Sequence, residues 1–257
     1  MSARTHRVLV EAAVESADAA VAVAEAGAER IELCANLTEG GTTPSLGTIG
    51  ATLARVQVPV FVMIRPRGGD FLYTPIELDV MMRDIAAARS AGAHGIVIGV
   101  LRSDGTVDIP RTRALVEATR PLPVTFHRAF DLAADLGAAL DALVECGVER
   151  VLTSGGASRA GDAIDTLAQL VRRSRGRISV MPGGGISAAN AARIIEATGA
   201  HEIHVGGTKL IAGEMQFRRS EISFARAPLP DEYTRTAPDL ERLRDVVSAL
   251  AGTMTTA

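Results

Sequence analysis

Eight short apolar or β-branched runs recur along the chain, and their number limits the possible folds more than any other feature. Each run ends in Gly, Pro or a charged residue and gives way to an Ala-rich stretch with helical spacing. The runs are short enough for strands buried on both faces, and the stretches between them are long enough for crossover helices. The runs extend from Val8 to Glu11, Arg30 to Ala35, Val58 to Arg65, Gly95 to Leu101, Leu122 to His127, Arg150 to Ser154, Arg177 to Pro182 and Glu202 to Gly206. This pattern predicts an α/β fold, a single (β/α)8 TIM barrel that occupies residues 1–257.

An internal repeat supports this prediction. A glycine that can end a helix in the left-handed conformation precedes each even-numbered strand. These glycines are Gly27, Gly92, Gly147 and Gly199. The repeating unit is therefore two β/α pairs, used four times. The pattern lapses in an irregular segment near residues 212–233, and a last helix from Pro238 to Leu250 supplies the eighth helical element.

Composition excludes several classes of partner. The formal net charge is -3, aromatic residues make up 3% of the chain, and no Lys/Arg stripe is present, so we expect no nucleic-acid surface. The chain carries neither an N-terminal signal region nor an apolar run long enough to cross a membrane. Its two cysteines, Cys34 and Cys146, cannot form a disulfide framework, which suits a reducing compartment. We therefore expect a cytoplasmic protein that does not bind membranes.

Alternation within the strands predicts which side chains point into the barrel. Since alternate strands contribute to the same interior layer, the odd strands predict one layer and the even strands two more. The odd-strand layer is Glu11, Arg65, His127 and Met181. The lower even-strand layer is Glu32, Val97, Leu152 and His204, and the upper one is Cys34, Gly99, Ser154 and Gly206. Because the upper layer is small, we predict a cavity at the barrel mouth with carboxylates, a guanidinium and imidazoles on its floor.

Five residues are candidates for catalysis if the chain is an enzyme. They are Glu11, Glu32, Arg65, His127 and Asp131. His127 is placed where the fifth strand leaves the barrel, which is the catalytic end of this fold. The alternative is a structural ion network of Glu11, Glu32 and Arg65. His204 is interpreted as a core histidine, because its layer is mostly apolar.

Glycine-rich loops give a separate indication of an anion site. Loops after the seventh and eighth strands of TIM barrels often bind phosphate through backbone N–H groups. The candidate residues are Gly183, Gly184, Gly185, Gly206 and Gly207, together with Arg65 and Arg67, whose guanidinium groups suit carboxylate or phosphate. The alternative is that these glycines only permit tight turns.

Five longer motifs resemble those of the CutC family. They are RIELCA at Arg30 with EGGTTPS at Glu39, MIRPRGGDF at Met63, VTFHRAFD at Val124, RVLTSG at Arg150 and MPGGG at Met181. The similarity extends from about Val10 to Ser220. It implies a cytoplasmic TIM-barrel protein that is associated with copper homeostasis, binds copper through cysteine and forms a homodimer or homotetramer. No catalysed reaction is firmly attached to the family.

The family motifs do not carry over completely. Cys34 matches the cysteine of the family's second strand, so the resemblance implies a copper site at Cys34 with His127 or Met181. However, Ala13 stands where many members have a cysteine, and Gly206-Gly207 where many have Ser-Ala. Cu(I) prefers soft thiolate and thioether ligands, so a barrel with one thiol and a buried arginine suits this ion poorly.

Two functions therefore remain open. The first is a CutC-type protein that binds Cu(I) at the barrel mouth. The second is an enzyme that acts on a small phosphorylated or carboxylated metabolite by acid–base chemistry. In the second, His127 is the general acid or base, Glu11 or Glu32 is its partner, and Arg65 with the glycine loops holds the anion.

Overall fold

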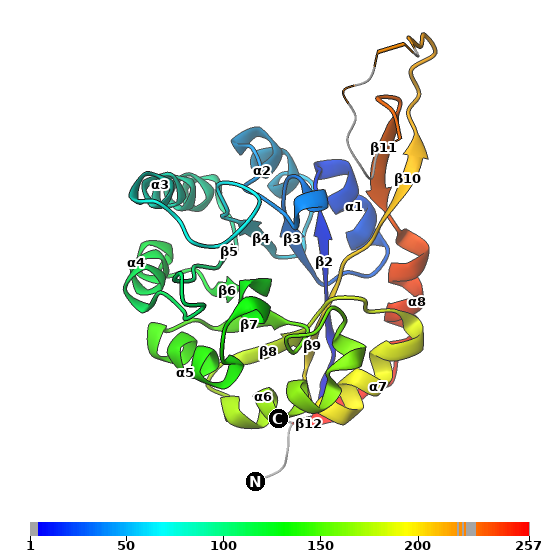
Figure 1. Cartoon of the computed structure of the whole chain (residues 1–257). Helices are drawn as coiled ribbons and strands as arrows, with labels where there is room; N and C mark the ends of the chain where they lie inside the picture. Colours follow the sequence, from blue (N-terminus) through cyan, green and yellow to red (C-terminus); the bar gives the residue numbers. More distant parts are fainter. Residues whose placement is uncertain (1–4, 220, 223, 225–229, 257) are drawn as a thin grey trace.

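A ring of eight parallel strands forms the centre of the molecule, which is described by a computed structural model (Figure 1). The structure describes residues 5–219, 221–222, 224 and 230–256. The strands are β2 (Leu9–Val14), β3 (Arg30–Leu33), β4 (Val60–Met63), β5 (Gly95–Ile98), β6 (Val124–Phe126), β7 (Arg150–Thr153), β8 (Ser179–Pro182) and β9 (Glu202–Val205). They pair in the order β8-β7-β6-β5-β4-β3-β2-β9, and a parallel bridge from Gly183 to His204 joins the two ends. The predicted TIM barrel is confirmed.

Eight helices surround the strands. They are α1 (Ala17–Glu25), α2 (Leu46–Leu53), α3 (Pro75–Ala91), α4 (Ile109–Thr119), α5 (Leu136–Cys146), α6 (Ile164–Ser174), α7 (Ala188–Thr198) and α8 (Leu240–Leu250). Three short 3-10 helices lie in the loops: η1 (Leu37–Glu39), η2 (Arg128–Leu132) and η3 (Ala160–Asp162). The glycines predicted to end helices have positive φ, including Gly92 after α3 and Gly147 after α5. No helix in the described part of the chain has the length and hydropathy needed to cross a membrane.

The two faces of the strands differ in chemistry. Side chains that point outward, such as Val10, Ile31 and Val62, join one buried apolar cluster with the helices. Side chains that point inward are largely polar and titratable. Since successive residues of a strand face opposite sides, this alternation fixes which residues reach the barrel interior.

The segment predicted to be irregular, near residues 212–233, follows the first strand of a hairpin that the sequence prediction missed, and its residues 220, 223 and 225–229 lie outside the described part of the chain. β10 (Thr208–Ala212) pairs antiparallel with β11 (Thr234–Pro238), and Figure 1 shows this hairpin projecting from the barrel beyond α8. A second small sheet, β1 (Thr5–Arg7) with β12 (Met254–Thr256), joins the two ends of the chain near the other end of the molecule. β10 has the sequence TKLIA and is largely exposed, so its three apolar residues are too few to identify it as a barrel strand.

Candidate functional site

A cavity of about 350 Å³ opens at the carboxyl ends of the barrel strands. We call it the mouth cavity. It is lined by Ala13, Glu32, Leu37, Glu39, Gly40, Met63, Arg65, Phe71, His127, Arg128, Ala129, Leu152, His204, Gly206, Gly207 and Thr208. Five of the predicted site residues therefore surround one space: Glu32, Arg65, His127, Gly206 and Gly207. This is the end of a TIM barrel at which catalytic residues are found.

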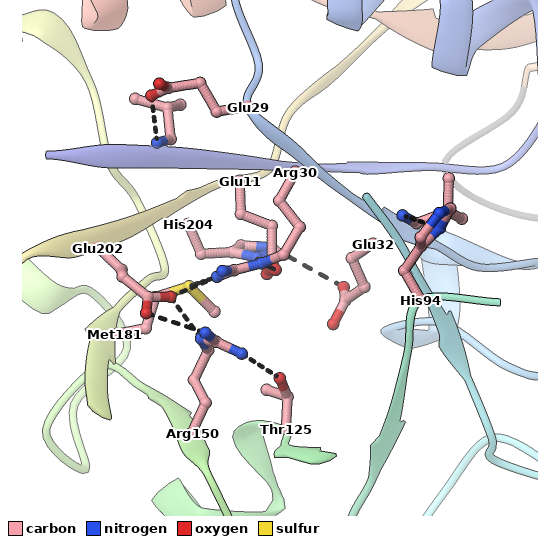
Figure 2. A network of polar contacts seen from close by, with 12 residues as sticks. Glu11, Glu29, Arg30, Glu32, His94, Thr125, Arg150, Met181, Glu202 and His204 are labelled. Carbon is pink, nitrogen blue, oxygen red and sulfur yellow. Dashed lines mark hydrogen bonds and ion pairs between the residues drawn. The ribbon is translucent and has the colours of Figure 1, made fainter. Parts of the chain in front are cut away.

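Below the mouth cavity, two arginines and two glutamates form a buried ion network (Figure 2). The Arg30 guanidinium lies between Glu11 and Glu202, and it also donates to the Met181 sulfur at 3.2 Å. Arg150 pairs with Glu202 from the other side. Burial alone would raise the pKa of Glu11, but Arg30 and His204 lower it to about 2. Glu11 is therefore a carboxylate at neutral pH.

His204 connects this ion network to the mouth cavity. Its Nδ1 lies 2.8 Å from Glu11 Oε1, which leaves Nε2 facing Glu32, 3.9 Å from Oε2. Burial opposes the charged imidazole, yet the neighbouring Glu11 and Glu32 raise the pKa of His204. A carboxylate that accepts from one ring nitrogen fixes the direction of the other, so Glu11 aims His204 at Glu32.

Glu32 lies at the floor of the mouth cavity, and only one of its two carboxylate oxygens has a hydrogen-bond partner among the described residues. Its Oε2 accepts from the Cys34 thiol at 3.6 Å, whereas Oε1 is buried without a partner among the described residues. Burial raises the pKa of Glu32, Glu11 raises it further, and His204 opposes the shift. Glu32 and His204 thus form an adjacent acid and base whose pKa values are both raised.

The heights of the inward-facing residues differ from the predicted odd-strand layer. The strand register places Phe61 and Thr125 at the level of Glu11 and Met181, with His127 above them and Arg65 nearest the loops. Arg65 therefore does not pair with Glu11 or Glu32; Arg30 pairs with Glu11 instead. The prediction of inward direction holds, but that of equal height is wrong, because the stagger between strands is not visible in one strand's sequence.

His127 and Arg65 occupy the upper wall of the mouth cavity. His127 Nδ1 accepts the N–H of Ala129 at 3.1 Å, and burial together with Arg65 lowers the pKa of His127 to about 3. Its ring is therefore neutral, with the proton on Nε2, and this atom has no partner among the described residues. Arg65 donates to three backbone carbonyls in the loops above the barrel, those of Glu39, Gly41 and Gly69.

Two other predicted residues serve the surrounding loops. Arg67 pairs with Glu77 and Asp70 and stacks over the Tyr73 ring, so its guanidinium already has anionic partners. Asp131 accepts from the backbone N–H of Ser154 at 3.0 Å and from the Thr153 hydroxyl at 2.5 Å, and it pairs with Arg128. Neither Arg67 nor Asp131 lines the mouth cavity.

The glycine loops are only partly free to bind an anion. The Gly183 N–H donates to the Thr153 carbonyl, whereas no hydrogen bond among the described residues uses the N–H of Gly184, Gly185, Gly206 or Gly207. Gly184 has φ +94, and a side chain there would press on Arg128 and Ser154. Gly206 lines the mouth cavity, and a Cβ on it would meet nothing within 4 Å. Gly206 is therefore the glycine at which the cavity can be altered without strain.

Comparison with known proteins identifies the family. The CutC family model matches residues 8–209. The copper homeostasis protein cutC homolog of Homo sapiens is 46% identical over 236 residues, which are 92% of this chain and 86% of the human protein. A family protein CutC of Mesorhizobium japonicum is 43% identical over 97% of this chain and 96% of its own. The chain belongs to the CutC family.

Solved structures agree with this family and with the fold. The crystal structure of the putative copper homeostasis protein CutC from Streptococcus agalactiae has a TM-score of 0.73 and 36% identity, covering 77% of this chain and 98% of the other. N-(5'-phosphoribosyl)anthranilate isomerase from Pyrococcus furiosus has a TM-score of 0.56 at 12% identity, covering 96% of this chain and 100% of the other. At that identity the likeness shows the barrel fold alone.

The cysteine that the CutC resemblance marks for copper is fully buried. Burial, and then Glu32, raise the pKa of the Cys34 thiol well above its ordinary value. Metals bind the thiolate, so this environment opposes ligation. Cys146, at the end of α5, is the other cysteine and accordingly takes no part in the mouth cavity.

A second group of possible metal ligands lies at and just below the floor of the mouth cavity. Glu11, Glu32 and His204 each offer an atom, and these atoms lie within 4.8 Å of one another. However, the Glu11 carboxylate already accepts from Arg30 through Oε2 and from His204 through Oε1. A metal would have to displace these bonds, so the set fits a proton-sharing group better than a metal site.

The sequence interpretation missed three members of the ion network. Arg30, Arg150 and Glu202 each begin a strand, two residues before Glu32, Leu152 and His204. Since side chains two apart share a face of a strand, the same alternation predicts that all three point inward. His204 was predicted to point inward and does so, but it lines the mouth cavity rather than an apolar core.

Proposed function

We propose that this CutC-family chain is an enzyme that transfers protons on a small anionic metabolite, with Glu32 and His204 as the proton-carrying pair. One observation carries the proposal: Glu32 Oε1 is buried beside the mouth cavity with no hydrogen-bond partner in the described part of the chain, next to a histidine that Glu11 orients. A buried polar atom without a partner is costly, so such an atom beside a cavity is a place where a ligand or a water molecule gains a hydrogen bond.

The two groups suit acid–base chemistry because their environments raise both pKa values. Glu32 with a raised pKa can hold its proton as a general acid, and His204 can accept or return one through Nε2. Glu11 stays ionised because Arg30 holds it, so it stabilises the His204 imidazolium. The ion network thereby orients the acid–base pair without taking part in proton transfer.

His127 has a different role in this proposal. Its neutral ring and its occupied Nδ1 leave it an N–H donor rather than a general base. The proposal therefore assigns acid–base chemistry to His204 and ligand binding to His127. Arg65 and the free N–H groups of Gly206 and Gly207 supply the positive potential for an anion.

Deuterium exchange tests the proposal without knowledge of the full reaction. The protein is incubated in D2O with small 2-oxo acids, 2-hydroxy acids and sugar phosphates, and loss of C–H signals is followed by proton NMR. We expect exchange with at least one compound, slowed at least about 100-fold in Glu32→Gln and in His204→Gln. Glu145→Gln changes an exposed carboxylate and is the matched control. Absence of exchange with every compound, or exchange unchanged in Glu32→Gln, contradicts the proposal.

Copper binding is a second candidate, favoured by one contact. A Cβ on Gly41 would lie 3.0 Å from Cys34 Sγ and 3.5 Å from Met63 Cε, so a thiol and a thioether lie beneath the same glycine. These are the ligands that Cu(I) prefers. We expect weak binding, at one site, that is lost in Cys34→Ser when Cu(I) is titrated against a competing chelator. Tight binding that survives this substitution excludes Cys34 as the main ligand.

Cytoplasmic location and homo-oligomerisation complete the proposal. Both cysteines are free and buried, which suits a reducing compartment. The projecting hairpin and the segment beyond β10 expose Leu210, Met215 and Phe217, a surface that a second copy of the chain can cover. We expect a dimer or tetramer by light scattering, weakened in Phe217→Ser. A monomer at every concentration contradicts this expectation.

A further inference from the structure

The geometry points to a carboxylate as the group that Arg65 and His127 recognise in the mouth cavity. This inference rests on the proposed function, because both place the ligand in the same space. It goes further by naming the chemical class of the ligand and the two side chains that select it. Neither side chain takes part in the proton transfer proposed for Glu32 and His204.

Arg65 is a buried cation without an anionic partner. It is 4% exposed, and its hydrogen bonds go to backbone carbonyls, which carry no charge. Within the described residues, no carboxylate lies within 4 Å of its guanidinium, and its Nε has no acceptor. The nearby Tyr73 hydroxyl cannot neutralise it, because burial raises the pKa of Tyr73 to about 12. An unpaired buried charge is costly, so an anion from solution would stabilise Arg65.

His127 offers a neutral donor beside this charge. It is 5% exposed, and its Nε2 is buried with no partner in the part of the chain that the structure describes. The Ala129 N–H, which His127 Nδ1 accepts at 3.1 Å, holds the ring, and Gly99 leaves room for it, since a Cβ there would lie 2.2 Å from His127 Cε1. Only glycine at position 99 allows the imidazole to lie there. The N–H is thus held in a constant direction before any ligand arrives, which lowers the entropy cost of binding.

The Phe71 ring contacts both the Arg65 guanidinium and the His127 ring. The Arg65 guanidinium lies 4.9 Å from the centroid of the Phe71 ring, and the His127 ring centroid lies 5.0 Å from it. Both side chains line the mouth cavity. Phe71 therefore brings a cation and an N–H donor together in the cavity that Glu32 and His204 also line.

The charge of this wall suits a carboxylate better than a phosphate ester. Arg128, the other arginine of the cavity, is already paired with Asp131. The Glu39 carboxylate also lines the cavity, but it lies against Gly68 and forms no ion pair with Arg65 among the described residues. Arg65 and His127 thus offer one unpaired cation and one neutral donor, which balance a single negative charge with two oxygen atoms. A dianionic phosphate would leave a second buried charge uncompensated, which costs several kcal/mol in the interior of a protein.

Ligand titration tests the assignment. Propionate, L-lactate and pyruvate are titrated at pH 7 by calorimetry, with propionamide and lactamide as neutral isosteres and inorganic phosphate as the competing anion. We expect at least one carboxylate to bind at least tenfold more tightly than its amide and than phosphate, because a hydrogen bond to a charged group is lost otherwise. Equal affinity for acid and amide overturns the inference, and so does tighter binding of phosphate.

His127→Phe and His94→Phe form a matched pair. His94 also accepts a backbone N–H through Nδ1, that of Val60, but it lies at the amino-terminal end of β5 and is exposed. We expect affinity for the carboxylate to fall about tenfold in His127→Phe and to stay unchanged in His94→Phe. In the wild-type protein, the Nε2 proton of His127 should shift downfield with pyruvate and not with lactamide, a readout that needs no variant. If the chemical shift of the His127 Nε2 proton does not change with pyruvate, the proposed role of His127 is overturned.

The outcomes separate this inference from the proposed function. Carboxylate binding that persists in Glu32→Gln, with no deuterium exchange in any protein, supports the inference and contradicts proton transfer. Deuterium exchange on sugar phosphates without carboxylate binding supports proton transfer and contradicts the inference of a carboxylate ligand. The two proposals can therefore fail independently.

Discussion

The lower and upper halves of the barrel interior hold similar residues under different conditions. In the ion network, Arg30, Arg150, Glu11 and Glu202 pair with one another (Figure 2). In the mouth cavity above, Glu32, Arg65 and His127 each keep a buried polar atom without a partner among the described residues. Burial is similar in both halves, so burial does not distinguish them. Satisfaction of the polar groups does distinguish them, and on this ground we propose that the lower half is structural and the upper half is a ligand site.

The largest expected effect comes from breaking the ion network. Arg30→Met leaves Glu11 and Glu202 without their shared cation, and we expect a loss of about 3–5 kcal/mol in the free energy of unfolding. Arg113→Met breaks an exposed pair with Glu145 and should cost no more than about 1 kcal/mol. Urea denaturation at pH 7 measures both. Similar losses in the two variants would show that burial of the network does not increase its contribution to the free energy of unfolding.

The dependence of stability on acidic pH tests the same comparison at Glu11. Its pKa is lowered from 4.5 to about 2, so its ionised form contributes stability above pH 4.5 that is lost as the pH falls toward 2. We expect wild type to exceed Glu11→Gln by about 3 kcal/mol at pH 7, with a gap that narrows below pH 4.5. Denaturation from pH 7 to pH 3 measures this gap. A stability difference between the two proteins that does not change with pH would contradict the lowered pKa of Glu11.

Glu32 should respond to pH in the opposite direction. Its pKa is raised by burial, so the stability linked to its protonated form is full below pH 4.5 and is lost as the pH rises through the raised value. We expect Glu32→Gln to gain stability relative to wild type between pH 4 and pH 8, while proton transfer is abolished. The same denaturation series gives the stability, and deuterium exchange gives the activity. A variant that loses stability on raising the pH would place Glu32 in the structural half.

The smallest effect on stability is expected at Gly206. Gly206→Asp adds a carboxylate to the mouth cavity where a Cβ meets no atom within 4 Å, and Gly206→Ala is its control. Both should change the free energy of unfolding by less than about 0.5 kcal/mol, as exposed substitutions do. A carboxylate ligand should raise the melting temperature of wild type and Gly206→Ala, but not that of Gly206→Asp. Equal responses in all three would place the anion elsewhere. Gly184→Asp is a poorer test because its positive φ strains the backbone.

Local chemistry explains why the strands and their inward faces could be predicted. Apolar runs, glycine helix ends and the two-residue alternation are properties of short segments, so they predict eight strands and the direction of Glu11, Glu32 and His127. The long family motifs likewise identify CutC from residues alone. The hairpin of β10 and β11 escaped prediction because its strands are short and largely polar, with only Leu210 to Ala212 forming an apolar run.

The partners of those inward residues depend on tertiary structure. Sequence alone determined that Glu11, Arg65 and His127 point into the barrel, because alternation is set within each strand. The tertiary structure decided that Arg30 holds Glu11, that Arg65 stays without an acid, and that His204 is aimed at Glu32. The reason is the stagger between paired strands, since it sets the height of every side chain and arises only when the barrel closes.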